Sequence, residues 1–192
     1  MTVRLSAYLA PLALVLSWQA LAATPPRDPS GAWLTEDGRA RVRVEKCGPS
    51  QEQVCGYVVW IKAGSSAPTT DRNNPDPRKA SRALLGHQLM LGLKPNADGQ
   101  YEGLIYNAED GKTYDVTVWI EGRGDLKVKG CLVSFLCSTQ TWTRTSDLQP
   151  GQLAASTGTP GGPRPDPEWA VKSTGSTSPA QAVQRRDATP RP

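Results

Sequence analysis

The chain contains one histidine, His87, which a Ser–His–Asp hydrolase would need as a general base between a nucleophile and an orienting carboxylate. No serine lies in a Gly-x-Ser-x-Gly turn, and His87 falls within the apolar segment 85–91. A lone histidine on an apolar strand is typical of a satisfied structural residue rather than of a base. We therefore expect no nucleophilic catalysis from this chain.

Glycoside hydrolysis is the other reaction to consider, because a pair of carboxylates can catalyse it. Glu109 and Asp110 are adjacent, so in a strand they would point to opposite faces, and their surroundings indicate a turn. The polar segment 71–78 has oxygen ligands that suit calcium, but its pattern is not an EF-hand and favours Asx-turns in a strand connection. We expect no enzyme, metal or other cofactor, and we keep Asp71 and Asn74 as candidates in a binding loop.

Tyrosine and tryptophan are abundant between residues 57 and 142, whereas phenylalanine occurs once in the chain. Each combines an apolar ring with a polar tip, as small-ligand pockets do. The alternative is that these rings simply fill the interior of a small barrel. Our ligand-binding candidates are Tyr57, Trp60, His87, Tyr106, Tyr114 and Trp119.

The first residues predict export. Arg4 precedes an apolar run over residues 5–21, and an Ala-Leu-Ala sequence ends at Ala22. A positive start, an apolar middle and an Ala-x-Ala finish are typical of a cleaved Sec-type signal peptide. The run is short for a membrane anchor, and no basic stop follows Ala23. We predict a signal peptide over residues 1–23 and a periplasmic or secreted product that does not span the membrane.

Composition changes at Pro150, after which Pro, Gly, Ser, Thr, Ala and Gln dominate and Trp169 is the single aromatic residue. Such a segment buries too little apolar surface to offset its ordering entropy, so we predict a disordered tail over residues 150–192. Residues 23–149 keep 16 of the 22 basic and 15 of the 18 acidic side chains. This near balance gives no electrostatic case for a nucleic-acid partner.

The four cysteines form two close pairs, Cys47 with Cys55 and Cys131 with Cys137. An even number in an exported chain indicates disulfides, because the destination is oxidising. Three connectivities are possible, and local pairing fits two hairpin-like connections best. A zinc site or a redox-active pair would normally use Cys-x-x-Cys spacing, which is absent here.

Eight segments alternate apolar and polar residues and are separated by Gly, Asn and Asp, which is typical of antiparallel strands. They span residues 32–35, 41–46, 55–62, 85–91, 101–106, 113–121, 126–131 and 138–144. Closing such a sheet removes its exposed edges. We predict an all-β fold over residues 24–149, a small antiparallel up-and-down barrel of about eight strands, with a β-sandwich as the alternative.

A series of short motifs runs in order along Gly31–Arg144. They are Cys55-Gly56-Tyr57-Val58-Val59-Trp60, Asp71-Arg72-Asn73-Asn74-Pro75, Leu85-Gly86, Gly103-Leu104-Ile105-Tyr106-Asn107, Asp110-Gly111-Lys112-Thr113-Tyr114, Gly130-Cys131 and Gln140-Thr141-Trp142-Thr143-Arg144. This series resembles the bacterial exported family of domain of unknown function 2147. The resemblance implies a lipocalin-like, calycin-type barrel with a mouth, and it implies no established activity.

The lipocalin comparison implies one further contact. In that superfamily a Gly-x-Trp opens the first strand, and an arginine of the last strand packs over the tryptophan. Trp33 and Arg144 fit these positions. A guanidinium over a sheltered indole gains about 1–2 kcal/mol, so this pair would have a structural role at one end of the barrel.

The favoured function is a non-enzymatic periplasmic or secreted barrel that binds a small, partly apolar ligand. Tyrosine and tryptophan would line the cup, with His87 and the loop 71–78 near its mouth. The alternative is a structural or interaction module of the cell envelope, with a filled barrel and partner contacts through loops and tail. An open apolar cavity would favour the first, and a packed interior with an exposed aromatic patch the second.

Overall fold

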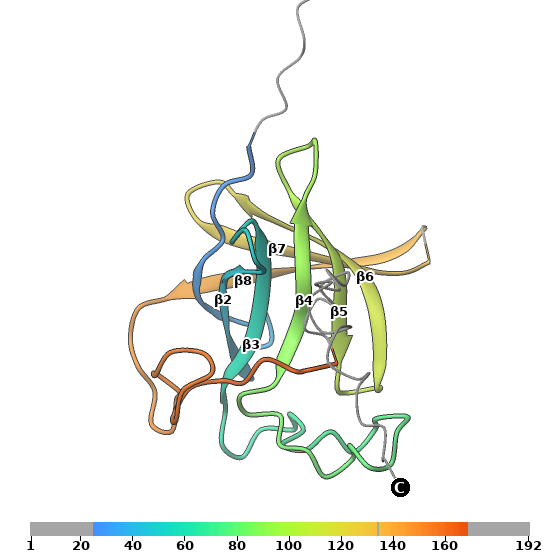
Figure 1. Cartoon of the computed structure of the whole chain (residues 1–192), viewed down its shortest axis with the longest axis vertical. Helices are drawn as coiled ribbons and strands as arrows, with labels where there is room; N and C mark the ends of the chain where they lie inside the picture. The colour runs from blue at the N-terminus through green and yellow to red at the C-terminus, as the bar shows by residue number, and fades with distance from the viewer. Residues whose placement is uncertain (1–24, 134, 169–192) are drawn as a thin grey trace, which may run out of the picture.

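A computed structural model describes residues 25–133 and 135–168; the predicted signal peptide, Thr24, Ser134 and residues 169–192 lie outside this description. Its strands are β1 (Gly31–Leu34), β2 (Ala40–Cys47), β3 (Gln53–Ile61), β4 (Gln88–Pro95), β5 (Tyr101–Asn107), β6 (Lys112–Glu121), β7 (Asp125–Val133) and β8 (Leu136–Thr145). Each strand pairs antiparallel with the next, and β8 pairs with β1, which closes the barrel (Figure 1). The predicted up-and-down barrel is confirmed. Within the described ranges, no helix is long and apolar enough to cross a membrane.

All eight predicted strands are present, but the fourth was placed too early, at residues 85–91. The chain turns before β4, because Gly86 adopts a φ of 88°, which a side chain would disfavour. The Gly86 N–H donates to the Val58 carbonyl at 2.7 Å, and the Val58 N–H donates to the His87 carbonyl at 2.9 Å. The first part of this apolar run therefore ends a connection, and β4 begins at Gln88.

One end of the barrel is filled with apolar side chains. In β2, Val42 and Val44 are buried while Arg43 and Glu45 are less buried, as period-two alternation requires. Gly56 makes room for the core, since a Cβ there would lie 2.8 Å from the Met90 side chain. The buried core consists of Trp33, Val42, Val44, Val54, Met90, Leu93, Tyr101, Val116, Val118, Leu126, Val128 and Trp142.

The contact expected between Trp33 and Arg144 is present and closes this filled end. The guanidinium carbon lies 4.2 Å from the indole centroid, and Arg144 Nη1 donates to the Ser30 carbonyl at 2.8 Å. Trp33 Nε1 donates to the Pro29 carbonyl at 2.9 Å, so the fully buried indole is satisfied. A Cβ at Gly31 would lie 2.2 Å from the arginine, which explains the Gly-x-Trp pattern.

Both disulfides pair locally, as predicted. Cys47 and Cys55 join β2 to β3, and Cys131 and Cys137 join β7 to β8. Connections at opposite ends of an up-and-down barrel alternate along the chain, so each end carries one disulfide. The pair in β7 and β8 lies beside the hairpin tip, where the two cysteines face each other in the strand register.

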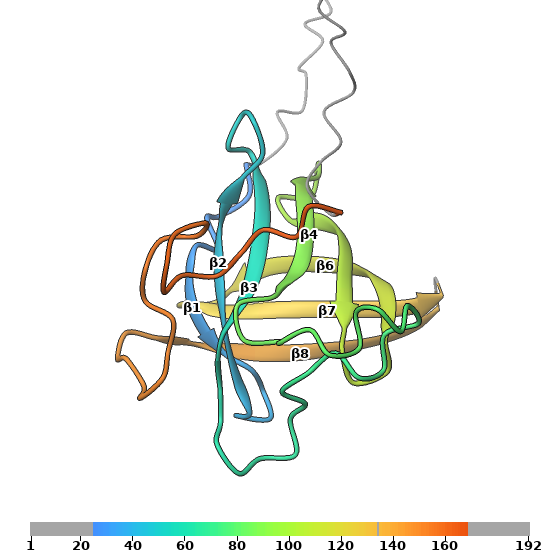
Figure 2. The same cartoon turned by 60° about the horizontal axis from the view of Figure 1, so that its bottom comes forward.

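The prediction of a disordered tail from Pro150 is wrong for residues 150–168. Residues 147–168, which we call the strap, cross the outer face of β2 and β3 toward β4 (Figure 2). The Leu153 N–H donates to the Val59 carbonyl at 2.9 Å, and the Arg164 N–H donates to the Gly86 carbonyl at 3.0 Å. Arg43 donates to the Ala155 carbonyl and to Thr157, each at 2.8 Å. Partners on the barrel therefore order a segment whose own composition would not.

Candidate ligand-binding cavity

The barrel is hollow at the end opposite the Trp33–Arg144 pair. An up-and-down topology gathers the connections β1–β2, β3–β4, β5–β6 and β7–β8 at this end. Residues of the first three connections and of the adjoining strands, β7 and β8 among them, enclose a cavity of about 510 Å³. This volume lies within the ~300–1,000 Å³ range of small-molecule sites.

The floor of the cavity is apolar. Val42, Val128 and Trp142 belong both to the buried core and to the cavity lining. The indole N–H of Trp142 donates to Gln140 Oε1 at 2.8 Å, so the ring offers the cavity an apolar face with its polar atom already paired. Leu89 adds to the apolar wall. A ligand seated here would therefore bury its apolar part first.

Three of the six predicted ligand-binding residues, His87, Tyr106 and Tyr114, line the cavity. Trp142 was missed as a candidate, although alternation along β8 could have found it. Ser138, Gln140 and Trp142 follow one another at period two, and all three line the cavity.

Tyr57, Trp60 and Trp119 do not line this cavity, so the structure does not bring these three candidates together with the others. Tyr57 is buried beside Arg43 and Glu45, and burial followed by the Glu45 charge raises its pKa to about 12. Trp60 lies beneath the Arg41 guanidinium and borders a second, smaller pocket with strap residues. Each aromatic ring alternates with an aliphatic neighbour that takes the inner face, as Val118 does beside Trp119.

His87 is a polar residue held in an apolar wall. It is 7% exposed, and its Nε2 has no hydrogen-bond partner, so the expectation of a satisfied structural histidine is wrong for this atom. Its ring meets the Tyr106 ring edge to face, with centroids 5.7 Å apart. Burial, and then the positive charge of Arg82, lower the pKa of His87 to about 4. The imidazole is therefore neutral at neutral pH.

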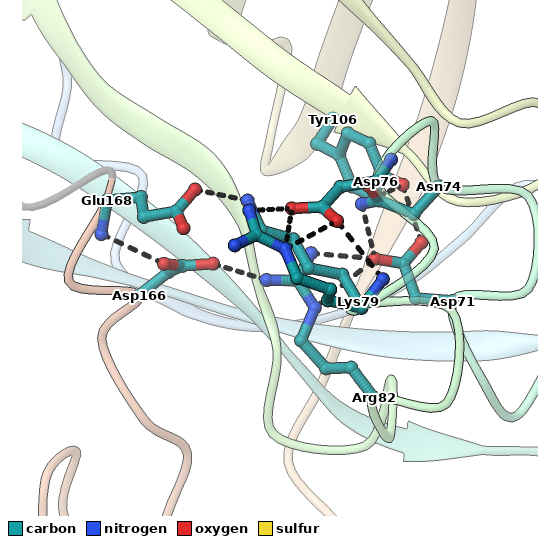
Figure 3. Close-up of polar contacts among 9 residues, drawn as sticks. Asp71, Asn74, Asp76, Lys79, Arg82, Tyr106, Asp166 and Glu168 are labelled. Carbon is teal, nitrogen blue, oxygen red and sulfur yellow. Dashed lines mark hydrogen bonds and ion pairs between the residues drawn. The ribbon is translucent and has the colours of Figure 1, made fainter.

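A buried polar cluster fixes Tyr106 from behind (Figure 3). The fully buried carboxylate of Asp71 accepts hydrogen bonds from the Tyr106 hydroxyl and, at 2.8 Å, from Asn74 Nδ2. Burial, and then the hydrogen bond to Asp71, raise the pKa of Tyr106 to about 12. Asp71 and Asn74, the predicted loop candidates, thus lie behind the wall and position a lining residue.

Arg82 links this cluster to the strap (Figure 3). Its guanidinium donates to Asp71 and to Asp166, each at 2.6 Å, and Lys79 pairs with Glu168. The connection between β3 and β4, residues 62–87, is therefore held between the cavity wall and the strap. Sequence reasoning missed Arg82 and Asp166 because they are 84 residues apart, in segments that were interpreted as loop and tail.

The rim of the cavity is joined across its mouth by Arg39. This side chain pairs with Asp37 at 2.7 Å and with Glu109 at 2.6 Å, which connects the β1–β2 and β5–β6 hairpins. Asn73 Nδ2 donates to the Glu109 carbonyl at 2.6 Å, which ties in the β3–β4 connection. The mouth is thus built from mutually braced connections.

The described residues contain no group of three or more His, Cys, Asp or Glu side chains that could hold a metal ion. The cavity offers apolar surface, aromatic faces and a polar rim, with one unpaired imidazole nitrogen in its wall. This arrangement can bind a small molecule by burial and orient it by a few polar contacts.

Comparison with known proteins agrees with the fold. Among solved structures, the lipocalin-family protein HP1028 of Helicobacter pylori is similar, with 27% identity, a TM-score of 0.54, and coverage of 62% of this chain and 84% of that chain. A search of curated proteins found no match. The model of DUF2147, described as an uncharacterized protein conserved in bacteria, matches residues 31–144, which ends before the strap. This match covers more than half of the chain and the whole circuit of strands up to Arg144, and the chain belongs to the bacterial DUF2147 family.

Proposed function

We propose that this protein is an exported, non-enzymatic barrel that binds one small, partly apolar ligand in its hollow end. The observation that carries the proposal is the cavity of about 510 Å³ with an apolar floor and aromatic walls. Barrels of eight strands have room for one small ligand when side chains do not fill them, as in lipocalins. The similarity to a lipocalin-family protein supports the same use of the interior.

The non-enzymatic part rests on the surroundings of His87. A hydrolase base is hydrogen bonded to its nucleophile and to an orienting group, whereas His87 Nε2 has no partner. A pKa of about 4 also makes this imidazole a weak base at neutral pH. These features support binding rather than turnover.

Export is part of the same proposal. The first residues carry the pattern of a Sec-type signal peptide, with Arg4 ahead of an apolar run and an Ala-Leu-Ala finish. Two disulfides are typical of proteins in oxidising compartments. Both features support a periplasmic or secreted location.

The binding claim is tested by titrating the purified protein with the neutral fluorophore N-phenyl-naphthylamine. We expect saturable fluorescence enhancement from one site. Ile105→Trp places an indole in the cavity lining and should weaken binding roughly tenfold or more. Leu104→Trp is the matched control, because this neighbouring residue is exposed and does not line the cavity. Absence of saturable binding, or equal weakening by both variants, would refute the proposal; thermal unfolding verifies that each variant folds.

A second candidate, the envelope interaction module, is favoured by the tip of the β7–β8 hairpin. Phe135 is 90% exposed, and Leu132 and Leu136 are more than half exposed beside it. Figure 1 shows this hairpin extending away from the barrel. Phe135→Ser distinguishes the two functions: it should leave fluorophore affinity unchanged under the first and abolish capture of a partner under the second.

A further inference from the structure

The charged side chains at the cavity rim leave no cation free. Asp37, Arg39 and Glu109 are the charged residues that line the cavity within the described ranges. The Arg39 guanidinium lies between the two carboxylates, at 2.7 Å from Asp37 and 2.6 Å from Glu109. An anion at the mouth would have to compete with both carboxylates for this one guanidinium. All three side chains are partly exposed, so the electrostatic penalty for an anion at the mouth is moderate and depends on the salt concentration.

The same arrangement recurs behind the wall. Arg82 is shared by Asp71 and Asp166 (Figure 3). Together with the rim, four carboxylates share two guanidiniums at this end of the barrel. Two further cations of the β3–β4 connection pair with acids of their own, Arg78 with Asp76 and Lys79 with Glu168.

Three other cations of the neighbouring connections and strands lie outside the cavity lining. These are Lys62, Arg72 and Lys112, and none of them is a lining residue. The charged lining of the cavity is therefore net negative, with two carboxylates against one guanidinium.

Three neutral donors of the aromatic wall are already used by the protein. The Tyr106 hydroxyl donates to Asp71, the Tyr114 hydroxyl to Asp110, and the Trp142 indole to Gln140. What these rings offer a ligand is their faces, and aromatic faces attract cations. His87 is uncharged at neutral pH and supplies no positive charge. A buried carboxylate would therefore lose its hydration without gaining an ionic partner.

From this distribution of charge we propose that the cavity selects neutral or cationic amphiphiles and discriminates against carboxylates with the same apolar tail. The inference rests on the proposed function and names the ligand class of that site. A neutral head group loses little hydration free energy when it enters the cavity. An ammonium head group is attracted electrostatically by the carboxylates of Asp37 and Glu109 at the rim.

Displacement of bound N-phenyl-naphthylamine by decylamine, decanol and decanoate tests the charge preference at constant tail length. At neutral pH and low salt, decylamine and decanol should displace the fluorophore at least roughly tenfold more effectively than decanoate. Raising the salt concentration should narrow the ratio between decylamine and decanoate, because the rim charges are exposed. Equal displacement by decanoate would overturn the inference and leave the proposed function standing. Failure of the fluorophore itself to bind would overturn both.

The double variant Asp37→Asn, Glu109→Gln assigns the preference to the rim. It frees Arg39, so the affinity for decanoate should rise roughly tenfold, that for decylamine should fall, and that for decanol should stay constant. Glu109→Gln alone should change the ratio of the affinities for decylamine and decanoate in the same direction, but by less. It leaves the β1–β2 turn intact, because the Glu109 side chain contacts Arg39 and not that turn's backbone.

The matched control is Asp98→Asn, Glu102→Gln, which makes the same change in charge at the filled end, in the β4–β5 connection and at the start of β5. Neither residue lines the cavity. An unchanged order of affinities in the rim variant, or an equal shift in the control, would overturn the inference.

Discussion

Arg82→Gln removes the cation from a carboxylate that has no access to water. Asp71 is fully buried, and Arg82 contacts it at 2.6 Å while remaining one-quarter exposed itself. Breaking a buried ion pair from one side typically costs about 3–5 kcal/mol, because the other charge stays buried. Asp71 keeps its hydrogen bonds from Tyr106 and Asn74, so we expect the lower end, about 3 kcal/mol of unfolding free energy.

Arg78→Gln is the matched control in the same connection. Arg78 also pairs with an aspartate, Asp76 at 2.7 Å, but its side chain is 87% exposed. Solvent screens such a pair, so this variant should leave the free energy of unfolding nearly unchanged.

Urea unfolding followed by tryptophan fluorescence, with the disulfides intact, measures both variants by linear extrapolation. Losses that are equal in the two variants, or a loss below about 1 kcal/mol for Arg82→Gln, would refute the reasoning. Such a result would mean that the buried cluster does not hold the β3–β4 connection against the cavity wall.

Three further predictions concern pH, backbone packing and crosslinking. The pKa of His87 is about 4 in the fold against an ordinary 6.5, so the unfolded state binds the proton more readily. The free energy of unfolding should therefore fall by up to roughly 3 kcal/mol as the pH drops from 6.5 toward 4. His87→Gln should lack this component when urea unfolding is measured as a function of pH. Gly111→Ala should lower the melting temperature far more than Gly122→Ala, because both have positive φ but only at Gly111 would a Cβ meet a backbone oxygen, at 1.9 Å. Replacing Cys131 and Cys137 by serine should cost about 2 kcal/mol in urea unfolding, since the closed loop is short; no loss would contradict a crosslink that constrains the unfolded chain.

The barrel could be predicted because patterns within single short segments of the sequence determine its strands and turns. Alternation in segments such as β2 and β6 determines which residues face inward, and glycine and asparagine mark the turns between them. The Trp33–Arg144 contact was predicted from the resemblance to lipocalins. The cysteine pairing was predicted from the short spacing within each pair. The shift of β4 came from one residue, Gly86, whose positive φ ends an apolar run that looked continuous.

The cavity could be predicted only in part, because residue type does not determine which face a side chain occupies. Tyr57 and Trp119 are as aromatic as Tyr106, yet their aliphatic neighbours take the interior. Alternation along β8 could have identified Trp142 as a lining residue. The network around Arg82 joins positions far apart in sequence, and no local pattern brings them together.

The strap was missed for a related reason. A count of its own apolar residues omits the barrel groups that order it, among them Arg41 and Arg43. Arg41 is almost fully buried and donates to the Asp147 carbonyl at 2.7 Å. Composition therefore underestimates order wherever a segment binds a preformed surface.

The most direct test of the central claim is native mass spectrometry of the protein purified from its own cells without detergent, compared before and after denaturation. The account predicts a reproducible additional mass that leaves on unfolding and that Ile105→Trp, but not Leu104→Trp, fails to retain. The mass released should belong to a neutral or cationic molecule with an apolar part. A bare polypeptide in the native spectrum, with the cavity intact in the same preparation, would contradict the claim that the hollow end of the barrel carries a ligand.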